Sequence, residues 1–240
     1  MLLKRLREAN AQTHEPDADN TDAGRDCIEL CLFSGKFLRK GVFCMQKNKS
    51  ETHQDVIGCQ YQISVLRDNF VPMILDALGK VDTGKVWAKT AKTSTVYRGK
   101  AVHVVDCVKA CFSHIYDDTF PYIGMAATFY KSSLDDISKD CYIAEDDVLL
   151  NDVKKSFNVL ARVSIFPLGI ENYEEHTAAI SDIVKNRNIS VTEGYYANDL
   201  EGDIHDMFGL INDILEYGNK HIENYALNVS MTIYGPEAQK

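Results

Sequence analysis

Two clusters of polar side chains, about a hundred residues apart, hold the groups of this 240-residue chain that could do chemistry. The members of the two clusters are, in chain order, Ser94, Thr95, Arg98 and His103, then Tyr196, Asn198, Asp199, His205 and Asp206. Each cluster leads into a predicted helix, whose first backbone N–H groups have no partner within the helix. Hydroxyl, amide, carboxylate and imidazole groups beside such N–H groups suit a small ligand with several polar edges.

The same residues also have ordinary structural interpretations, and both remain open at this point. Ser94 and Thr95 fit a strand, and His103 and His205 fit structural histidines. Asp206 fits stabilisation of a helix dipole. The sequence contains no phosphate-binding glycine loop, no His-Glu-x-x-His, no nucleophile elbow and no Cys-x-x-Cys pair. It therefore predicts a binding module without a catalytic residue set, a metal or a cofactor.

The clusters occupy equivalent places in an internal repeat, residues 55–131 and 156–235. Each copy has an apolar strand, a helix, two short strands, an amphipathic helix and a last strand, and the endings ATFY and MTIY correspond. This order, βαββαβ taken twice, predicts an α+β fold of tandem ferredoxin-like repeats. Each repeat would form an antiparallel sheet with its helices on one face.

The other segments have simpler interpretations. Residues 132–155 form a charged linker with a short helix predicted from Asp146, and residues 1–54 form an N-terminal extension that is partly disordered. In the second copy, strands are predicted at 189–193 and 195–198. In the first, Asp68 is the favoured N-cap of the helix that starts at Phe70, with Asn69 as the alternative.

The first strand of each copy alternates apolar and polar residues, so one face of each sheet carries polar side chains. Gln62 and Ser164 lie on that face, together with Gln60 and Arg162. Since the helices cover only the opposite face, this one must be solvated, bound to a ligand or packed on another sheet. The last option predicts a compact pair of domains or a homodimer.

Composition excludes several classes of protein. A formal net charge of -9 disfavours nucleic-acid binding, and no apolar run approaches the roughly 18 residues that insertion into a membrane requires. Seven cysteines, several within apolar stretches, indicate buried thiols in a reducing compartment and hence a cytoplasmic protein. The N-terminus is basic but lacks the apolar region of a secretory signal, and a short organelle-targeting sequence is the alternative.

The chain resembles the YkoF-type thiamine/hydroxymethylpyrimidine-binding proteins. The similarity lies in residues 85–90 and 94–99 with His103 in the first copy, and in 196–208 and the Pro167-Leu168 turn in the second. It extends over about 55–234. The resemblance implies tandem ferredoxin-like repeats, a dimer, and a thiamine site in each repeat of a protein that serves vitamin uptake or salvage and is not an enzyme.

By position, the resemblance implies that Ser94, Thr95 and Arg98 belong to the first site. It likewise implies Tyr196, Asn198 and Asp199 for the second. The chain departs from the family pattern at Val102, where the family has an acid, and at Arg67, where it has the proline that Pro167 keeps in the second copy. The first site is therefore expected to bind more weakly or differently.

Two other functions compete with this one. Tandem ferredoxin-like domains also serve as regulatory effector-binding modules of the amino-acid-sensing type, although this chain has no length for an attached catalytic or DNA-binding domain. A thiamine-salvage enzyme would use His205 together with Asp206 for acid–base catalysis. A ligand screen and an assay for turnover of thiamine would separate these from a binding protein.

Overall fold

The computed structural model describes residues 55–119, 122–132, 144, 146–195 and 197–234. The predicted N-terminal extension and Tyr196 lie outside these residues. The elements of the first copy are β1 Val56–Val65, α2 Phe70–Gly79, β2 Trp87–Thr90, β3 Thr95–Lys100, α3 Ala101–Ile115 and β4 Tyr122–Lys131. Those of the second copy are β5 Asn158–Pro167, α4 Tyr173–Lys185, β6 Ser190–Thr192, β7 Asp199–Asp203, α5 Ile204–His221 and β8 Tyr225–Tyr234. The α+β class and the repeated βαββαβ order are as predicted.

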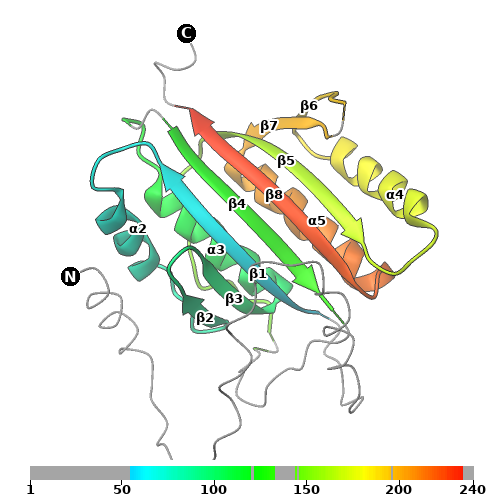
Figure 1. The fold of residues 1–240 in the computed structure, drawn as a ribbon, viewed down its shortest axis with the longest axis horizontal. Helices are drawn as coiled ribbons and strands as arrows, with labels where there is room; N and C mark the ends of the chain where they lie inside the picture. Colours follow the sequence, from blue (N-terminus) through cyan, green and yellow to red (C-terminus); the bar gives the residue numbers. More distant parts are fainter. Residues whose placement is uncertain (1–54, 120–121, 133–143, 145, 196, 235–240) are drawn as a thin grey trace, which may run out of the picture. The chain divides into compact units, whose positions relative to one another are not determined.

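The two copies share a single eight-stranded sheet with the strand order β2-β3-β1-β4-β8-β5-β7-β6 (Figure 1). Their last strands, β4 and β8, pair antiparallel from Tyr122 opposite Tyr234 to Lys131 opposite Tyr225. Each four-stranded half thereby covers the edge that the other would expose. An exposed strand edge invites pairing with other chains, so this junction also removes a liability of each half.

All four described helices lie behind the sheet in the view of Figure 1, and none of them covers the face toward the viewer. We call this the open face. The other face packs on the helices through alternating strand residues such as Phe129 and Leu227, which are fully buried. The two inner helices, α3 and α5, contact each other, and buried side chains of both copies form one continuous core. The two repeats are therefore built as one packing unit.

Buried thiols in the first copy match the expectation from sequence. Cys59, Cys107 and Cys111 are buried and free. Burial raises the pKa of Cys107 to about 12 and that of Cys111 to about 11, so both thiols stay protonated at neutral pH. A protonated, buried thiol is a poor nucleophile, which makes these residues packing groups.

Two local predictions were wrong, and of the two caps predicted for α2 the alternative is the one that the structure has. Residues 195, 197 and 198 are not in a strand. The third strand of the second copy is β7, Asp199–Asp203, and its sequence DLEGD has low strand propensity. Its pairing with β5 on one side and β6 on the other outweighs that propensity. The cap of α2 is Asn69 rather than Asp68, in a left-handed conformation that asparagine tolerates.

The helix predicted from Asp146 does not form either. Residues 146–157, which we call the strap, run without helical structure over the first copy. Asp106 of α3, which is 5% exposed, accepts hydrogen bonds from Leu150 N, Asn151 N and Asn151 Nδ2 at 3.3, 3.1 and 2.8 Å. Lys155 Nζ donates to Tyr116 O at 3.0 Å. The bonds to Asp106 use the backbone N–H groups of Leu150 and Asn151, which a helix from Asp146 would need for itself.

Asp203 caps α5, and its contribution to stability can be tested by pH. Burial opposes ionisation of this carboxyl, but hydrogen bonds from Ser156 and the backbone N–H of His205 outweigh it and lower its pKa. A carboxyl with a lowered folded-state pKa stabilises above its unfolded value of about 4 and loses that stabilisation as pH falls through the folded value. Asp203→Asn keeps an oxygen that can cap the helix but loses the charge, so it is expected to cost up to about 1 kcal/mol at pH 7 and less below pH 4, measured by urea unfolding at each pH. A cost that does not depend on pH would contradict this.

Candidate functional site

A band of polar side chains crosses the open face from one half of the sheet to the other. Strand register places Gln60 opposite Thr128, Thr128 opposite Asn228 and Asn228 opposite Ser164. The adjacent row contains Gln62, Ala126, Ser230 and Arg162 in the same order. Neighbours opposite each other in antiparallel strands share a face, so these rows form one surface. We call this surface the polar band, and we include in it Ser94 and Asp199 from the neighbouring strands. Its polar members are Gln60, Gln62, Ser94, Thr128, Arg162, Ser164, Asp199, Asn228 and Ser230.

Hydrogen bonds between strands organise the band. Gln60 Nε2 donates to Ser94 Oγ at 3.0 Å in the first copy, and Thr128 Oγ1 donates to Asn228 Oδ1 at 3.0 Å across the junction between the copies. Their remaining donors and acceptors are exposed. The band can therefore present both to a ligand with several nitrogen and oxygen edges.

The corresponding place in the second copy is charged. Arg162 Nε and Nη2 donate to the carboxylate of Asp199, which lowers the pKa of Asp199 and raises that of Arg162. Both side chains are more than half exposed, so the pair contributes little to stability. The pair matters for binding, because it supplies a carboxylate as hydrogen-bond acceptor and a planar guanidinium as donor. At the corresponding position the first copy has the neutral Gln60–Ser94 pair.

Apolar side chains flank the polar band on the same face. Tyr130, Leu160, Phe166 and Tyr234 are each 38 to 49% exposed, and they belong to the alternating set that points away from the helices. The rings of Tyr122 and Tyr234 meet edge to face with centroids 5.6 Å apart. Rings beside hydrogen-bonding groups are the usual lining of a site for a flat heterocycle.

The structure divides the sequence-predicted residues between the two faces. Gln62, Ser94, Ser164 and Asp199 lie on the open face and contribute to the polar band. Arg98 lies on the same face, opposite Gly58, one row from Gln60. Asn198 is exposed in the loop before β7, where its Oδ1 accepts a 3.4 Å hydrogen bond from Gly194 N.

The remaining predicted residues lie on the helical side. Thr95 is 6% exposed and bonds through Oγ1 to Thr90 Oγ1 at 3.2 Å. His103, 1% exposed, bonds through Nε2 to Asp146 O at 2.7 Å and so holds the strap. His205 and Asp206 lie in the first turn of α5, on the helical side of the sheet. One chain therefore does not bring all the predicted residues into a single site, because successive strand residues point to opposite faces.

His205 already has a partner from the other repeat. Its Nδ1 lies 2.7 Å from Nζ of Lys109 on α3. Desolvation lowers the pKa of Lys109, although Asp106 and Asp203 act in the opposite direction. An ammonium donating to Nδ1 occupies the lone pair that a general base would use. This contact favours a structural role for His205 at the junction of the two repeats.

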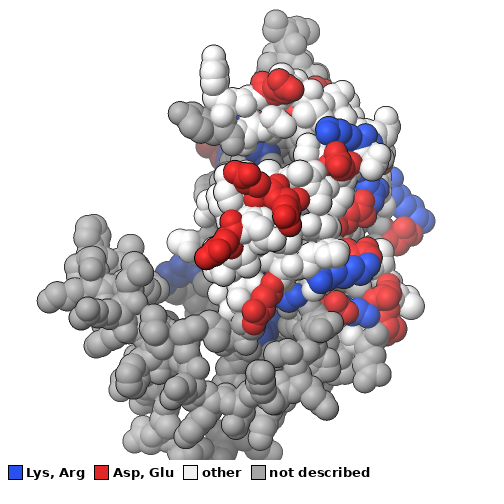
Figure 2. Space-filling view, turned by 90° about the vertical axis from the view of Figure 1, so that its right-hand side faces the viewer, with Lys and Arg blue, Asp and Glu red and all other residues white. Residues whose placement is uncertain are grey.

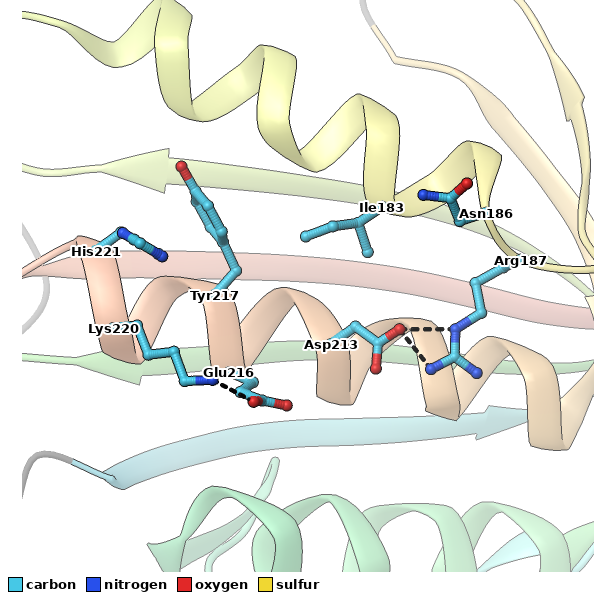
Figure 3. A pocket seen from close by; sticks show the side chains of 8 residues that line it. All are labelled: Ile183, Asn186, Arg187, Asp213, Glu216, Tyr217, Lys220 and His221. Atoms are coloured by element: carbon cyan, nitrogen blue, oxygen red, sulfur yellow. Dashed lines mark hydrogen bonds and ion pairs between the residues drawn. The ribbon is translucent and has the colours of Figure 1, made fainter.

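A hollow lies on the helical side, between α4 and α5 (Figure 3). No residue predicted from the sequence lines it. Its charged groups are paired with each other: Arg187 donates to Asp213 and Lys220 to Glu216. The rings of Tyr217 and His221 are tilted by 31° with centroids 4.6 Å apart, and the Tyr217 hydroxyl lies 2.9 Å from His176 Nδ1. With these groups already engaged, the polar band is the stronger candidate.

Two further observations limit the chemistry. Among the residues that the structure describes, no group of histidines, cysteines or carboxylates is arranged to hold a metal ion. None of the described helices combines the length and the apolar character needed to cross a membrane.

The fold defines a class, tandem-repeat α+β proteins in which two βαββαβ repeats share one antiparallel sheet. The YKOF-related family model matches residues 56–133 and 158–238, one match for each copy. The chain therefore belongs to the YKOF-related family. It is 28% identical over 184 residues to the "Putative HMP/thiamine-binding protein YkoF" of Bacillus subtilis (strain 168), covering 75% of this chain and 92% of that protein.

A solved structure also shows similarity. The hypothetical protein MJ1052 of Methanocaldococcus jannascii is 19% identical, with a TM-score of 0.29, over 31% of this chain and 77% of that one. At this level of similarity it carries no argument about function. The family membership rests on the match to both repeats and on the Bacillus relative.

Proposed function

We propose that the protein binds thiamine or its hydroxymethylpyrimidine part on the open face, with one site in each repeat, and serves uptake or salvage of the vitamin in the cytoplasm. The observation that supports this most is the polar band with its aromatic flanks. An aminopyrimidine has an amino donor beside ring-nitrogen acceptors, which Asp199, Gln60 and Gln62 can match. The name of the Bacillus relative supports the same ligand class.

The function is binding rather than turnover in this proposal. The relative is named as a binding protein, and His205, the base that an enzyme would need, is engaged by Lys109. No described helix covers the open face within one chain, whereas small ligands are normally enclosed. We therefore include a homodimer in the proposal, with the second copy covering the ligand.

Calorimetry tests this proposal with thiamine and with free hydroxymethylpyrimidine as separate titrants. Asp199→Ala is expected to weaken binding in the second copy by about tenfold or more, because a hydrogen bond to a charged group contributes roughly 1.5–3 kcal/mol. Binding in the first copy should persist. Asp182→Ala, which removes an exposed carboxylate from α4, is the matched control.

Two results would contradict the proposal in different ways. Folded protein that gives no heat with either ligand would exclude the ligand class. Loss of all binding in Asp199→Ala, with the fold intact by circular dichroism, would exclude independent sites in the two repeats.

A further inference from the structure

The hollow between α4 and α5 contains polar groups that the proposed vitamin site does not use. Its volume is about 350 Å³, and its lining runs along α5 from Asp213 to His221 (Figure 3). These two residues are separated by about 12 Å along the axis of a helix. A hollow of this volume and length suits a small molecule.

The two ion pairs of the hollow leave several donors and acceptors unused. Arg187 donates through Nε and Nη2 to Asp213 Oδ2. Lys220 Nζ donates to Glu216 Oε1, and an ammonium group has two further donors. No described residue bonds to Arg187 Nη1, Asp213 Oδ1 or Glu216 Oε2. The lining therefore presents N–H donors and carboxylate oxygens together, and the charges of the two pairs cancel.

A lining with both charges fits a zwitterion. A ligand with a single charge would meet a group of its own sign next to the group that binds it. A ligand with an ammonium and a carboxylate group can pair with both signs. Figure 2 looks at the side of the molecule that carries α4, where several basic side chains lie beside acidic ones. The polar lining therefore favours a ligand that has both charges and no net charge.

Gly209 of α5 gives the guanidinium of Arg187 its place. A Cβ atom at Gly209 would lie 2.7 Å from Arg187 Nη1, so only a residue without a side chain lets the guanidinium lie against the helix there. Arg187 Nη2 also donates to Gly209 O at 3.3 Å. The cationic end of the hollow is therefore held in position before any ligand binds.

The first repeat is closed at the corresponding place. Counted from the first residue of α3 and of α5, Asp213 corresponds to Ala110 and Glu216 to Ser113. Ala110 and Ser113 are 0% and 1% exposed, whereas the side chains of Asp213 and Glu216 are 38% and 66% exposed. The fold that both repeats share does not require these charges, which favours a separate role for them in the second repeat.

Aromatic and apolar side chains lie at the other end of the hollow. His221 and Tyr217 lie ring to ring, and His176 meets the Tyr217 ring edge to face with centroids 5.9 Å apart. Ile183 lines the hollow from α4 (Figure 3). Rings and a branched aliphatic chain are favourable surroundings for the aromatic ring of a ligand.

We propose that the hollow between α4 and α5 binds a free α-amino acid with an aromatic side chain. The ammonium group of the ligand donates to Asp213 Oδ1 and Glu216 Oε2. Its carboxylate accepts from Arg187 Nη1 and Lys220 Nζ, and its ring lies against Tyr217. This site lies on the helical side of the sheet and is independent of the polar band on the open face.

Calorimetric titration of the full chain with L-phenylalanine tests the proposal, together with three analogues that each lack one group. Phenethylamine lacks the carboxylate, 3-phenylpropionate lacks the ammonium group and glycine lacks the ring. L-Phenylalanine is expected to bind once per chain, and each analogue at least tenfold more weakly. Absence of L-phenylalanine binding would overturn the proposal, and so would an analogue that binds equally well.

Two variants locate the site. Gly209→Ala places a methyl group where the Arg187 guanidinium lies, and it should not destabilise α5, because alanine favours helix more than glycine. Glu216→Gln removes one acceptor for the ammonium group. Each is expected to weaken L-phenylalanine binding about tenfold, since hydrogen bonds to charged groups are the stronger ones. Asp76→Asn is the matched control, because Asp76 forms an exposed pair of the same i,i+4 spacing on α2.

The outcomes separate this inference from the proposed function. Gly209→Ala and Glu216→Gln should bind thiamine as the wild type does, and Asp199→Ala should bind L-phenylalanine as the wild type does. Unchanged L-phenylalanine binding in both hollow variants would place the amino acid elsewhere and overturn the inference. Thiamine titration of the wild type answers the question of the vitamin site whichever result the hollow gives.

Discussion

Asp106→Ala is expected to lower the free energy of unfolding by about 3 kcal/mol. The buried carboxylate accepts three hydrogen bonds from the strap, two of them from the backbone N–H groups of Leu150 and Asn151. Removing it leaves these donors without their acceptor, and each donor that stays buried without a partner costs roughly 1–3 kcal/mol. The bonds are only partly buried, so water can replace some of them, and the expected loss is near the cost of one or two donors. Equilibrium urea unfolding measures the change.

The matched control is Asp152→Ala. Asp152 lies in the same strap, but its side chain is 78% exposed and pairs with the exposed Lys154. Its loss should change stability by less than about 0.5 kcal/mol. Hydrogen exchange at the amides of Leu150 and Asn151 should accelerate in the Asp106 variant alone. Equal effects of the two substitutions would show that the strap is not held by Asp106.

Phe208→Ala in the second repeat is expected to destabilise the first repeat as well. Phe208 lies in α5 and is 1% exposed, so its truncation leaves a cavity that costs about 3–5 kcal/mol. Because the core is continuous through both repeats, this loss should appear in a single unfolding transition. Trp87, the chain's one tryptophan, lies in β2 of the first repeat and reports it by fluorescence. The urea midpoint should fall by roughly 1–2 M.

Tyr173→Ala serves as the control, since this aromatic residue of α4 is 56% exposed. Its effect on the Trp87 transition should be small. If Trp87 fluorescence in Phe208→Ala follows the wild-type curve while circular dichroism shows an earlier loss of structure, the repeats unfold separately. In that case the shared sheet would not make them one cooperative unit.

The repeated element order was predictable from sequence because it depends on local signals. Alternation in β1 and β5 and the helical spacing in α3 and α5 each lie within one segment. The same alternation predicted that Gln62 and Ser164 share the open face. The pairing of β4 with β8 was not predictable in this way. A strand has the same alternation of apolar and polar residues whether it lies at the edge of a sheet or at its centre.

The candidate site was less predictable than the fold. Thr95 follows Ser94 directly, so a sequence cluster that looks compact is divided by the strand between two faces. The strong bond from His103 to the strap depends on a linker whose path no local pattern specifies. The band across β4 and β8, with Thr128 and Asn228, was missed because its members come together only through strand pairing 100 residues apart.

The β4–β8 junction has a consequence for how the chain can be divided. Each repeat ends in the strand that pairs with the last strand of the other repeat. A chain cleaved near residue 140 would therefore yield two halves whose last strands, β4 and β8, can pair with each other. Mixed in equal amounts, such halves should reassemble into the eight-stranded arrangement. Either half alone would have its last strand exposed at a sheet edge. A second molecule of the same half could cover that edge by pairing its own last strand with it.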